Sequence, residues 1–501
     1  CTAIGARAPR PRNANAGRDV TRWGVLAFAG TSLISTFTSL SPTASTWGLG
    51  GYYGGLMLVL FTTAGYWAVR SYLDLENLDF VFWVLGITTS IVAVLYVLNI
   101  FNIDLIGAYA DTAVVERAQF FSTLGQKDFN GCFFSVALPI VFYQFLNAKD
   151  TRTAVWTGIP AAFGALALAV VDSEALALGI GAAVMVLVCH KNFTTRHLRR
   201  AALISAAFFG WAAWMHYMRA SVYTQGGTAL LAKLGAWQVA LPCMAASLLL
   251  WLVLFVLARK GIAAQAPLYL PGRGITIAVL AVGALAFVLA NAMPNRPLPE
   301  SLHNLLVFND DWGTYRGVAW RAAFGTWADG SLLRKIVGIG PGMMHTAVAA
   351  WAGDAMTARM ATFYAAHNEY LEQLLTTGIL GLTAWLLLVA AHLQRGERSW
   401  NTPGVAPVML ALCSYLAQAV VSIRVSMVFP LVMLLFGALA ALTAPELPQP
   451  AAPALRGKKQ QKPEPLPPKN AWYFAKTVLA AVLCMAAASG IAPLLFGFLM
   501  G

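Results

Sequence analysis

The stretch from Phe80 to Ile100, FVFWVLGITTSIVAVLYVLNI, contains no Lys, Arg, Asp or Glu. A helix must supply about 20 mainly apolar residues to cross the hydrocarbon core of a bilayer. The apolar residues here run continuously, whereas a transmembrane β-strand alternates apolar and polar residues. The stretch therefore predicts a membrane-spanning α-helix, in which the backbone polar groups are satisfied within the segment.

Comparable apolar runs recur along the chain on both sides of this stretch. They predict an all-α fold, a polytopic membrane helix bundle of about 12–13 transmembrane helices. The other candidate spans are Trp23–Leu40, Tyr52–Val69, Cys132–Leu146, Ala154–Val171, Ala175–Cys189, Ala201–Met218, Val239–Leu257, Ile275–Ala292, Tyr370–His392, Val405–Val421, Met427–Thr443 and Trp472–Met500.

The composition of the whole chain agrees with this prediction. Apolar residues make up 58% of the sequence and charged residues 11%, with a mean hydropathy of +0.65. A soluble domain carries roughly 25% charged residues, so most of this apolar surface must face lipid or other helices. The formal net charge of +13 raises the possibility of nucleic-acid binding. The basic residues lie in short segments between apolar runs, however, which is typical of topology signals and not of a nucleic-acid surface.

Basic residues also orient the predicted helices. The arginines from Arg7 to Arg22 precede the first apolar run and favour a cytoplasmic N-terminus, because cytoplasmic loops are rich in Lys and Arg. Continuing from there places most of the 34 lysines and arginines on the cytoplasmic side. It also places one unusually long segment, 294–368, outside the membrane. The chain is therefore expected to cross its membrane many times.

The same topology divides the chain into four parts. Residues 1–22 are predicted as a cytoplasmic segment, and 23–443 as the transmembrane domain with its extracytoplasmic loop 294–368. Residues 444–471 are rich in Pro and Lys, which predicts a flexible cytoplasmic linker. Residues 472–501 predict one additional transmembrane helix.

Three stretches with unusual residue patterns all fall on the outer side of this topology. The first contains STLGQKDFNG at Ser122–Gly131 and runs into an apolar helix. The second contains YRG at Tyr315–Gly317 and then GIGPG at Gly338–Gly342. The third begins with HNEY at His367–Tyr370 and continues to TTGILG at Thr376–Gly381.

The order of these stretches resembles the superfamily of O-antigen ligases and O-antigen polymerases of the bacterial envelope. Members show an Arg and a Gly-Thr-Leu-Gly-Asn-Pro-Asn-like stretch before a helix, then Gly-Arg…Trp, then Gly-Xaa-Gly-Pro. A His-Asn follows, opening a helix that contains Gly-Xaa-Xaa-Gly. The resemblance covers roughly 117–443 and is strongest from His367 to Leu382, directly after the long outer segment.

The resemblance implies a multi-pass protein of the bacterial cytoplasmic membrane. It also implies an inverting, metal-independent glycosyltransferase that needs no cofactor. Family members transfer a glycan from an undecaprenyl diphosphate carrier to an acceptor hydroxyl, with the acceptor being a glycan or glycolipid. A guanidinium offers two parallel donors to phosphate oxygens, and a histidine has a suitable pKa for a general base. Membrane lipids and these two substrates are the expected partners, and no nucleic acid is expected.

His367 is the expected catalytic base, with the alternative that it only precedes a helix capped by Asn368. Arg316, at the Gly-Arg position although Tyr315 replaces the Gly, is the first candidate ligand for the diphosphate. Arg117 and Arg219 come next. For Arg219, at the outer end of an apolar run, binding lipid headgroups is an equally good interpretation.

Four further residues are possible accessory groups. Glu369 is expected to orient or stabilise the site, and Arg424 lies in a short outer turn from which it can reach the cavity. Asp172 and Glu174 occupy a turn where many relatives have a Ser-Arg pair. A carboxylate cannot bind a diphosphate directly, so these acids are expected to contact sugar hydroxyls, hold an arginine or coordinate a cation.

Two other classes of function stay open. A flippase or transporter of lipid-linked glycans would place polar residues in the middle of several spans, with broken helices or repeated halves. A non-catalytic envelope assembly factor is the second alternative, suggested by Asp172 and Glu174. Within the enzyme hypothesis, the sequence does not distinguish a ligase from a polymerase.

Overall fold

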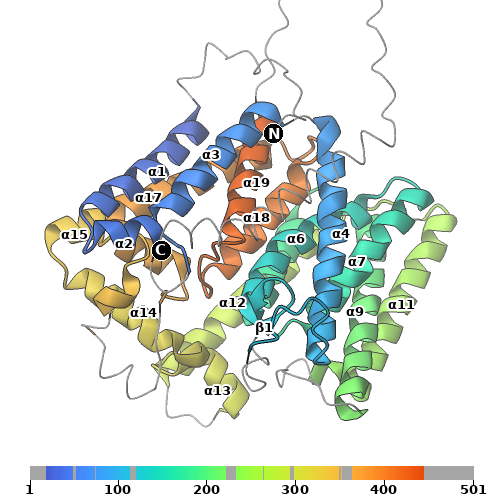
Figure 1. The fold of residues 1–501 in the computed structure, drawn as a ribbon. Coiled ribbons are helices and arrows are strands. Elements are labelled where there is room, and N and C mark those ends of the chain that lie inside the picture. Colours follow the sequence, from blue (N-terminus) through green and yellow to red (C-terminus); the bar gives the residue numbers. More distant parts are fainter. Residues whose placement is uncertain are drawn as a thin grey trace, which may run out of the picture. The chain divides into compact units, whose positions relative to one another are not determined.

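The computed structural model describes residues 19–48, 52–73, 75–112, 120–221, 233–262, 264–293, 298–348, 351 and 364–444. Nearly all of the regular structure in these residues is α-helical, and the compact unit that contains it spans Arg18–Thr443. Residues 1–18 of the predicted N-terminal segment, the linker after Ala444 and the predicted span Trp472–Met500 lie outside the described residues, whereas α1 already begins at Val20. Figure 1 shows the helices α1 (Val20–Phe37), α2 (Pro42–Trp47), α3 (Leu56–Tyr72), α4 (Leu75–Ile100), α6 (Lys127–Asn147), α7 (Thr151–Val170), α8 (Glu174–Cys189), α9 (Thr195–Ser221), α11 (Trp237–Arg259), α12 (Tyr269–Ala292), α13 (Glu300–Leu306), α14 (Trp312–Ala328), α15 (Leu332–Val337), α17 (Glu369–Arg398), α18 (Val405–Gln418) and α19 (Phe429–Leu442).

The predicted membrane helices are present. Each apolar run predicted between residues 23 and 443 coincides with a helix, because a continuous apolar run satisfies its backbone only by helical hydrogen bonds. Among the described residues, six helices are long and apolar enough to cross a membrane: α4, α6, α7, α11, α12 and α17. Helices α8, α18 and α19 are shorter and also apolar. The chain is therefore an all-α, multi-pass membrane protein.

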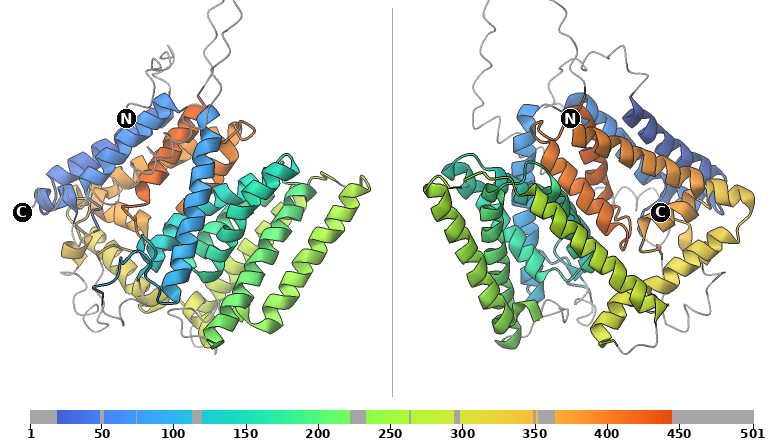
Figure 2. Two further views of the ribbon diagram at one scale, coloured as in Figure 1. Left: turned by 45° about the vertical axis from the view of Figure 1, so that its right-hand side comes forward. Right: turned by 180° about the vertical axis from the view of Figure 1, so that it is seen from behind.

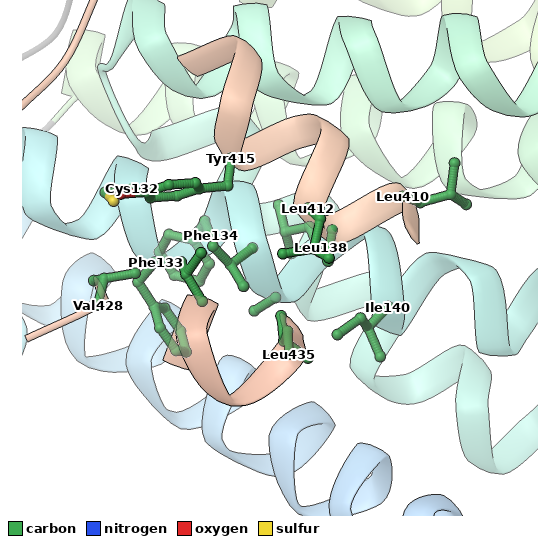
Figure 3. Close-up of a cluster of buried hydrophobic side chains, with 14 of the residues drawn as sticks. Cys132, Phe133, Phe134, Leu138, Ile140, Leu410, Leu412, Tyr415, Val428 and Leu435 are labelled. Atoms are coloured by element: carbon green, nitrogen blue, oxygen red, sulfur yellow. The ribbon is translucent and has the colours of Figure 1, made fainter. Parts of the chain in front are cut away.

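Helix α6 is mostly buried, and its side chains share one apolar cluster with those of α18 and α19. Figure 3 shows side chains of α6, among them Phe134 and Leu138, meeting those of α18 and α19. Between membrane helices, van der Waals contact and small residues drive association, because lipid chains are as apolar as the side chains. Accordingly, a Cβ added to Gly24 of α1 would lie 2.8 Å from the backbone of Leu388 in α17.

Helices α11 and α12 are mostly exposed, in contrast to α6. Only 6% of the apolar span in each is buried within the protein. Helix α11 packs beside α9, and the two run together in both views of Figure 2. Side chains such as Ile277 and Val282 of α12 are 67% exposed. In a membrane these faces contact lipid, which explains why the sequence is apolar on all sides of both helices.

The segment predicted as a long loop, 294–368, contains more structure than expected. Its described part forms α13, α14 and α15, and α14 contributes Val318, Ala319, Ala322 and Ala323 to a small apolar core. That core also includes Ile339 and Leu375, so the segment packs directly on α17. Helices α13 and α15 were missed in the sequence because they have only two turns or fewer of periodicity. Helix α14 is longer, but non-helical backbone at Gly313–Tyr315 interrupts its start.

The Ser122–Gly131 stretch forms a small hairpin in front of α6. Strands β1 (Phe120–Phe121) and β2 (Gly125–Gln126) pair antiparallel. The buried side-chain amide of Asn130 donates to the carbonyls of Phe121, Gly125 and Gln126 at 3.1–3.2 Å. Asn130 Oδ1 accepts from the Ser122 hydroxyl at 2.5 Å. The stretch therefore has a structural role, which is to fix the start of α6 and its residues Lys127 and Asp128.

Candidate functional site

Helix α17 is broken near its start, and the break shapes the candidate site. Gly378 has φ 68° and ψ −171°, so residues 369–377 form a separate first section of the helix. The GIGPG segment lies against this break. Ile339 N–H donates to the carbonyl of Leu375 at 3.2 Å, and Gly340 N–H donates to that of Thr376 at 2.9 Å. These bonds satisfy carbonyls that the break would otherwise leave without helical partners.

The close approach at the break explains two of the glycines. A Cβ on Gly378 would lie 2.2 Å from the carbonyl oxygen of Ile336, and one on Gly338 would lie 2.2 Å from that of Thr376. Both residues also have a positive φ angle, which residues other than glycine rarely adopt. The two sequence motifs GIGPG and TTGILG are therefore halves of one backbone contact.

The first section of α17 carries a buried ion pair. Glu369 is 2% exposed, and its carboxylate accepts from Arg424 at 2.7 Å and from the Tyr415 hydroxyl at 2.6 Å. Arg424 also donates to Gln373 Oε1 at 2.9 Å. Its guanidinium lies over the ring of Phe429, 4.6 Å from the centroid. The pair is thus hydrogen-bonded on both sides, as a buried pair must be to offset its desolvation.

A cavity opens beside this ion pair. It is open to the exterior, and the space inside it that the centre of a water molecule can occupy is about 40 Å³. The polar side chains that line it are those of Ser32, Tyr52, Tyr364, Glu369, Glu372, Gln373, Thr376, Thr377 and Arg424. Arg424, which the sequence analysis placed in a short outer turn, is among these lining residues. Neither His367 nor Arg316 is among the lining residues.

Arg316 is held by an unusual turn at the start of α14. Gly313, Thr314 and Tyr315 all have φ between 60° and 69°, a conformation that is strained for the last two. The turn brings the Gly313 carbonyl to 3.0 Å from Arg316 Nη1, which donates to it. The guanidinium is 13% exposed. Its Nε–H is buried and has no hydrogen-bond partner among the described residues, so it remains available to an anion.

His367 precedes α17 in an equally unusual conformation. Its φ is 49°, and its carbonyl accepts from the indole N–H of Trp320 at 3.4 Å. Asn368 caps the helix as expected, with its side-chain oxygen accepting from Tyr370 N–H and Leu371 N–H, both at 3.0 Å. Burial, and then the charge of Arg316, lower the pKa of His367 to about 4, although Asp128 acts in the opposite direction. The imidazole is therefore neutral at pH 7 and able to accept a proton.

The acids at the end of α7 and the start of α8 pair with basic residues. Glu174 lies 3.5 Å from Arg316, and Asp172 lies 3.7 Å from Lys127. The hydroxyl of Ser173, between them, donates to Asp128 at 3.0 Å. Of the three roles expected for these carboxylates, the structure shows that Glu174 holds an arginine. Glu174 is 74% exposed, so the pair with Arg316 is a weak one that a ligand can displace.

Of the two remaining arginine candidates, Arg219 lies within the described residues and Arg117 does not. Arg219 ends α9 near Asp172 and Tyr96, and its Nε–H is buried without a hydrogen-bond partner among the described residues. The described residues show no group that bridges Arg219 and Arg316 by hydrogen bonds or ion pairs. The structure thus brings together Arg316, His367, Glu174 and Asp128 as one charged group, with the Glu369–Arg424 pair in the neighbouring cavity.

Several residues of the site were missed in the sequence. These are Gln373, Tyr415, Tyr52, Tyr364 and Asp128, of which Asp128 lies within the Ser122–Gly131 stretch but was not proposed as a site residue. A usable signal existed for Gln373, because it lies one turn after Glu369 on the same face of a helix. Tyr52 and Tyr364 come from segments more than 300 residues apart, and local sequence gives no hint of their contact at 5.8 Å between ring centroids.

The described part of the chain contains no group of three or more His, Cys, Asp or Glu residues arranged to hold a metal ion. In comparisons with known proteins, no family model matches the chain and no curated protein sequence matches it significantly.

Proposed function

We propose that this protein is an envelope polysaccharide ligase or polymerase of the bacterial cytoplasmic membrane. It transfers a glycan from undecaprenyl diphosphate to an acceptor hydroxyl on the outer side. Two neighbouring residues carry the proposal. Arg316 has a buried N–H donor without a hydrogen-bond partner among the described residues. His367 is neutral and close enough to Arg316 for that positive charge to lower its pKa. The resemblance of the ordered motifs supplies the reaction class.

The reaction is a single displacement at the anomeric carbon of the donor sugar. The acceptor oxygen forms a bond to that carbon on the face opposite the diphosphate. The bond from carbon to the diphosphate oxygen breaks, and its electron pair leaves with undecaprenyl diphosphate. His367 takes the acceptor proton, while Arg316, assisted by Arg117 and Arg219, stabilises the negative charge of the leaving group. The product has inverted anomeric configuration.

Substrate binding and activation of the base are coupled in this proposal. In the protein without substrate, burial and the charge of Arg316 keep the pKa of His367 at about 4, which makes it a weak base. A diphosphate bound to Arg316 cancels that positive charge and adds negative charge nearby. Both effects raise the pKa of His367. The histidine therefore becomes a stronger base only when the donor is in place.

The test is transfer by the purified protein from a lipid-linked glycan to its acceptor. His367→Ala is expected to abolish the product, because no other group takes the proton. His303→Ala is the matched control, since His303 lies in α13 of the same outer segment and its backbone hydrogen bonds join it to Pro299 and Val307. Full activity of His367→Ala would exclude His367 as the base.

Envelope polysaccharides from a strain that lacks the gene distinguish the two enzymes. Single repeat units attached to the acceptor, with no polymer, indicate a polymerase. Long polymer that remains on the lipid carrier indicates a ligase. A strain complemented with His367→Ala is expected to resemble the deletion in either case.

One observation favours a transporter as a second candidate. Helix α17 is broken at Gly378, and the first section carries a buried ion pair, both of which are typical of helices that bind transported substrates. Flux of a labelled lipid-linked glycan across reconstituted vesicles tests this candidate. Flux that persists in His367→Ala, with no glycosyl transfer by the unaltered protein, would support the transporter over the enzyme.

A further inference from the structure

The cavity beside α17 has the wrong charge for a diphosphate. Its charged lining residues are Glu369, Glu372 and Arg424, two carboxyl groups against one guanidinium. The guanidinium is already engaged, because it donates to Glu369 and to Gln373 and lies over the ring of Phe429. Among the described lining residues, a phosphate entering this cavity would meet no cation without a carboxylate partner, and at least one carboxylate. An anion is therefore disfavoured here, whereas Arg316 outside the cavity retains a donor for one.

The remaining lining groups suit an uncharged, hydroxyl-rich ligand. Glu372 accepts one hydrogen bond, from Ala366 N–H at 3.3 Å, and forms no ion pair among the described residues. A carboxylate has about four acceptor positions, so most of its capacity is open to ligand hydroxyls. The hydroxyls and amide of Ser32, Gln373 and Thr376 add further polar groups to the wall.

A sugar site also needs an apolar surface for the face of the ring, and aromatic side chains provide one here. Tyr52 and Tyr364 both line the cavity, with ring centroids 5.8 Å apart and planes inclined by 34°. Tyr364 is stacked on His345 at 4.5 Å, which fixes the orientation of its ring. A tyrosine combines an apolar face with a polar hydroxyl, and a sugar ring has the same two kinds of surface.

The cavity is also adjacent in the chain to the charged group. Tyr364 and Ala365 form part of its wall, and Ala366 makes the hydrogen bond to Glu372. His367 is the next residue. A sugar in the cavity therefore lies against the segment that leads directly into the proposed base.

We infer that this cavity binds one uncharged sugar ring of the acceptor, with Glu372 accepting hydrogen bonds from its hydroxyls and the two tyrosines packing against its ring. That the sugar belongs to the acceptor rests on the proposed function, whereas the binding of an uncharged sugar does not. When it is ionised, Glu372 has a second, measurable effect: its negative charge disfavours acidic sugars.

The experiment is saturation-transfer-difference NMR on the full chain in a detergent without a sugar headgroup. The probes are methyl glucoside, methyl N-acetylglucosaminide and methyl glucuronide, with cyclohexanol as an apolar control. At least one uncharged glycoside is expected to bind, and the glucuronide is expected to bind more weakly. Glu372→Gln should weaken the uncharged glycoside about tenfold, since a charged hydrogen-bond partner is lost, and should reduce the discrimination against the glucuronide.

Two further variants make the result decisive. Tyr364→Leu removes the aromatic face and is expected to weaken all glycosides, which keeps the test valid if Glu372→Gln does not fold. Glu397→Gln is the matched control, because this carboxylate is 63% exposed and pairs with His190 at another site. Its binding should equal that of the unaltered protein.

The inference is overturned if no glycoside binds, if binding is the same in Glu372→Gln and Tyr364→Leu, or if inorganic pyrophosphate displaces the glycoside from Arg316→Gln protein. The last result would make the cavity an anion site. Sugar binding without any glycosyl transfer would instead reject the proposed function and leave the sugar site in place.

Discussion

At the scale of single residues, His367 and Arg316 depend on strained backbone for their positions. His367 has φ 49°, and the two residues before Arg316 have φ 61° and 69°. Such conformations cost about 1–3 kcal/mol each and persist only where the surroundings enforce them. Here the enforcing contacts are the Trp320 hydrogen bond to the His367 carbonyl and the Arg316 hydrogen bond to Gly313. Strain retained at both candidate residues is consistent with a site whose geometry matters.

The electrostatic link between these two residues gives a prediction for pH dependence. The pKa of His367 is lowered to about 4 from an ordinary value of 6.5, first by burial and then by Arg316. Arg316→Gln removes a positive charge, so protonation becomes easier and the pKa rises. NMR of ¹³C-labelled histidine, assigned with His367→Asn, measures this shift directly.

The sign for activity follows from the same shift. A base must be neutral, so transfer by the unaltered protein should be lost only as pH falls through the pKa of the substrate complex. Inorganic pyrophosphate is expected to raise the pKa of His367 in the unaltered protein and not in Arg316→Gln. A His367 pKa near 6.5 that neither Arg316→Gln nor pyrophosphate shifts would contradict the coupling between donor binding and the base.

The buried pair of Glu369 and Arg424 gives a prediction for stability. Arg424→Met leaves the carboxylate buried without its cation and should lower the free energy of unfolding by about 3–5 kcal/mol. Adding Glu369→Leu removes the stranded charge and should recover part of that loss, although Tyr415 and Gln373 lose partners. Thermal unfolding in detergent measures both effects.

A pair on the surface serves as the control for that stability experiment. Arg321, which is 56% exposed, pairs with Asp310. Exposed pairs contribute about 0–1 kcal/mol, so Arg321→Met should have little effect. Equal losses in Arg321→Met and Arg424→Met would show that burial does not determine the importance of the pair.

At the scale of elements, the break in α17 shows what an apolar run does and does not predict. The run from Tyr370 to His392 predicted a helix correctly, because satisfying the backbone in lipid is a local requirement. The break depends on hydrogen bonds from Ile339 and Gly340, and on a close approach of backbones that local sequence does not encode. The glycines were visible as motifs, but their pairing was not.

Gly378→Ala tests the role of the break. In an uninterrupted helix, alanine is favoured over glycine by about 1 kcal/mol. At Gly378 the positive φ and the Ile336 carbonyl, 2.2 Å from an added Cβ, make alanine strongly unfavourable. We expect lower thermal stability and loss of transfer, measured on the purified protein.

The control for this substitution is Gly30→Ala in α1. No atom lies within 4 Å of a Cβ added there, and the residue is helical. Alanine at Gly30 should leave stability unchanged or raise it by up to about 1 kcal/mol. A Gly378→Ala protein as stable as Gly30→Ala would mean that the break is not needed.

At the scale of the whole molecule, the predicted topology states which side of the membrane each group of residues faces. The charged group at His367 and Arg316 should face the outside, while Arg395, which pairs with Asp19 at 2.7 Å, should face the cytoplasm. With the native cysteines replaced by serine, Ser331→Cys should react with a membrane-impermeant maleimide in intact cells. Arg398→Cys should react only after the membrane is opened. The reverse pattern would place the site in the cytoplasm and remove access to an outer acceptor.

The sequence by itself determined that this is a helical, multi-pass membrane protein and where its apolar helices lie. Those features follow from the cost of exposing backbone and charge to lipid, which each segment must meet alone. Only the tertiary structure decided that Arg424 neutralises Glu369, that Glu174 holds Arg316, and that Tyr52 and Tyr364 share a cavity with Glu372. These contacts join segments far apart in the chain, and their energies depend on burial and distance, which no single stretch of sequence specifies.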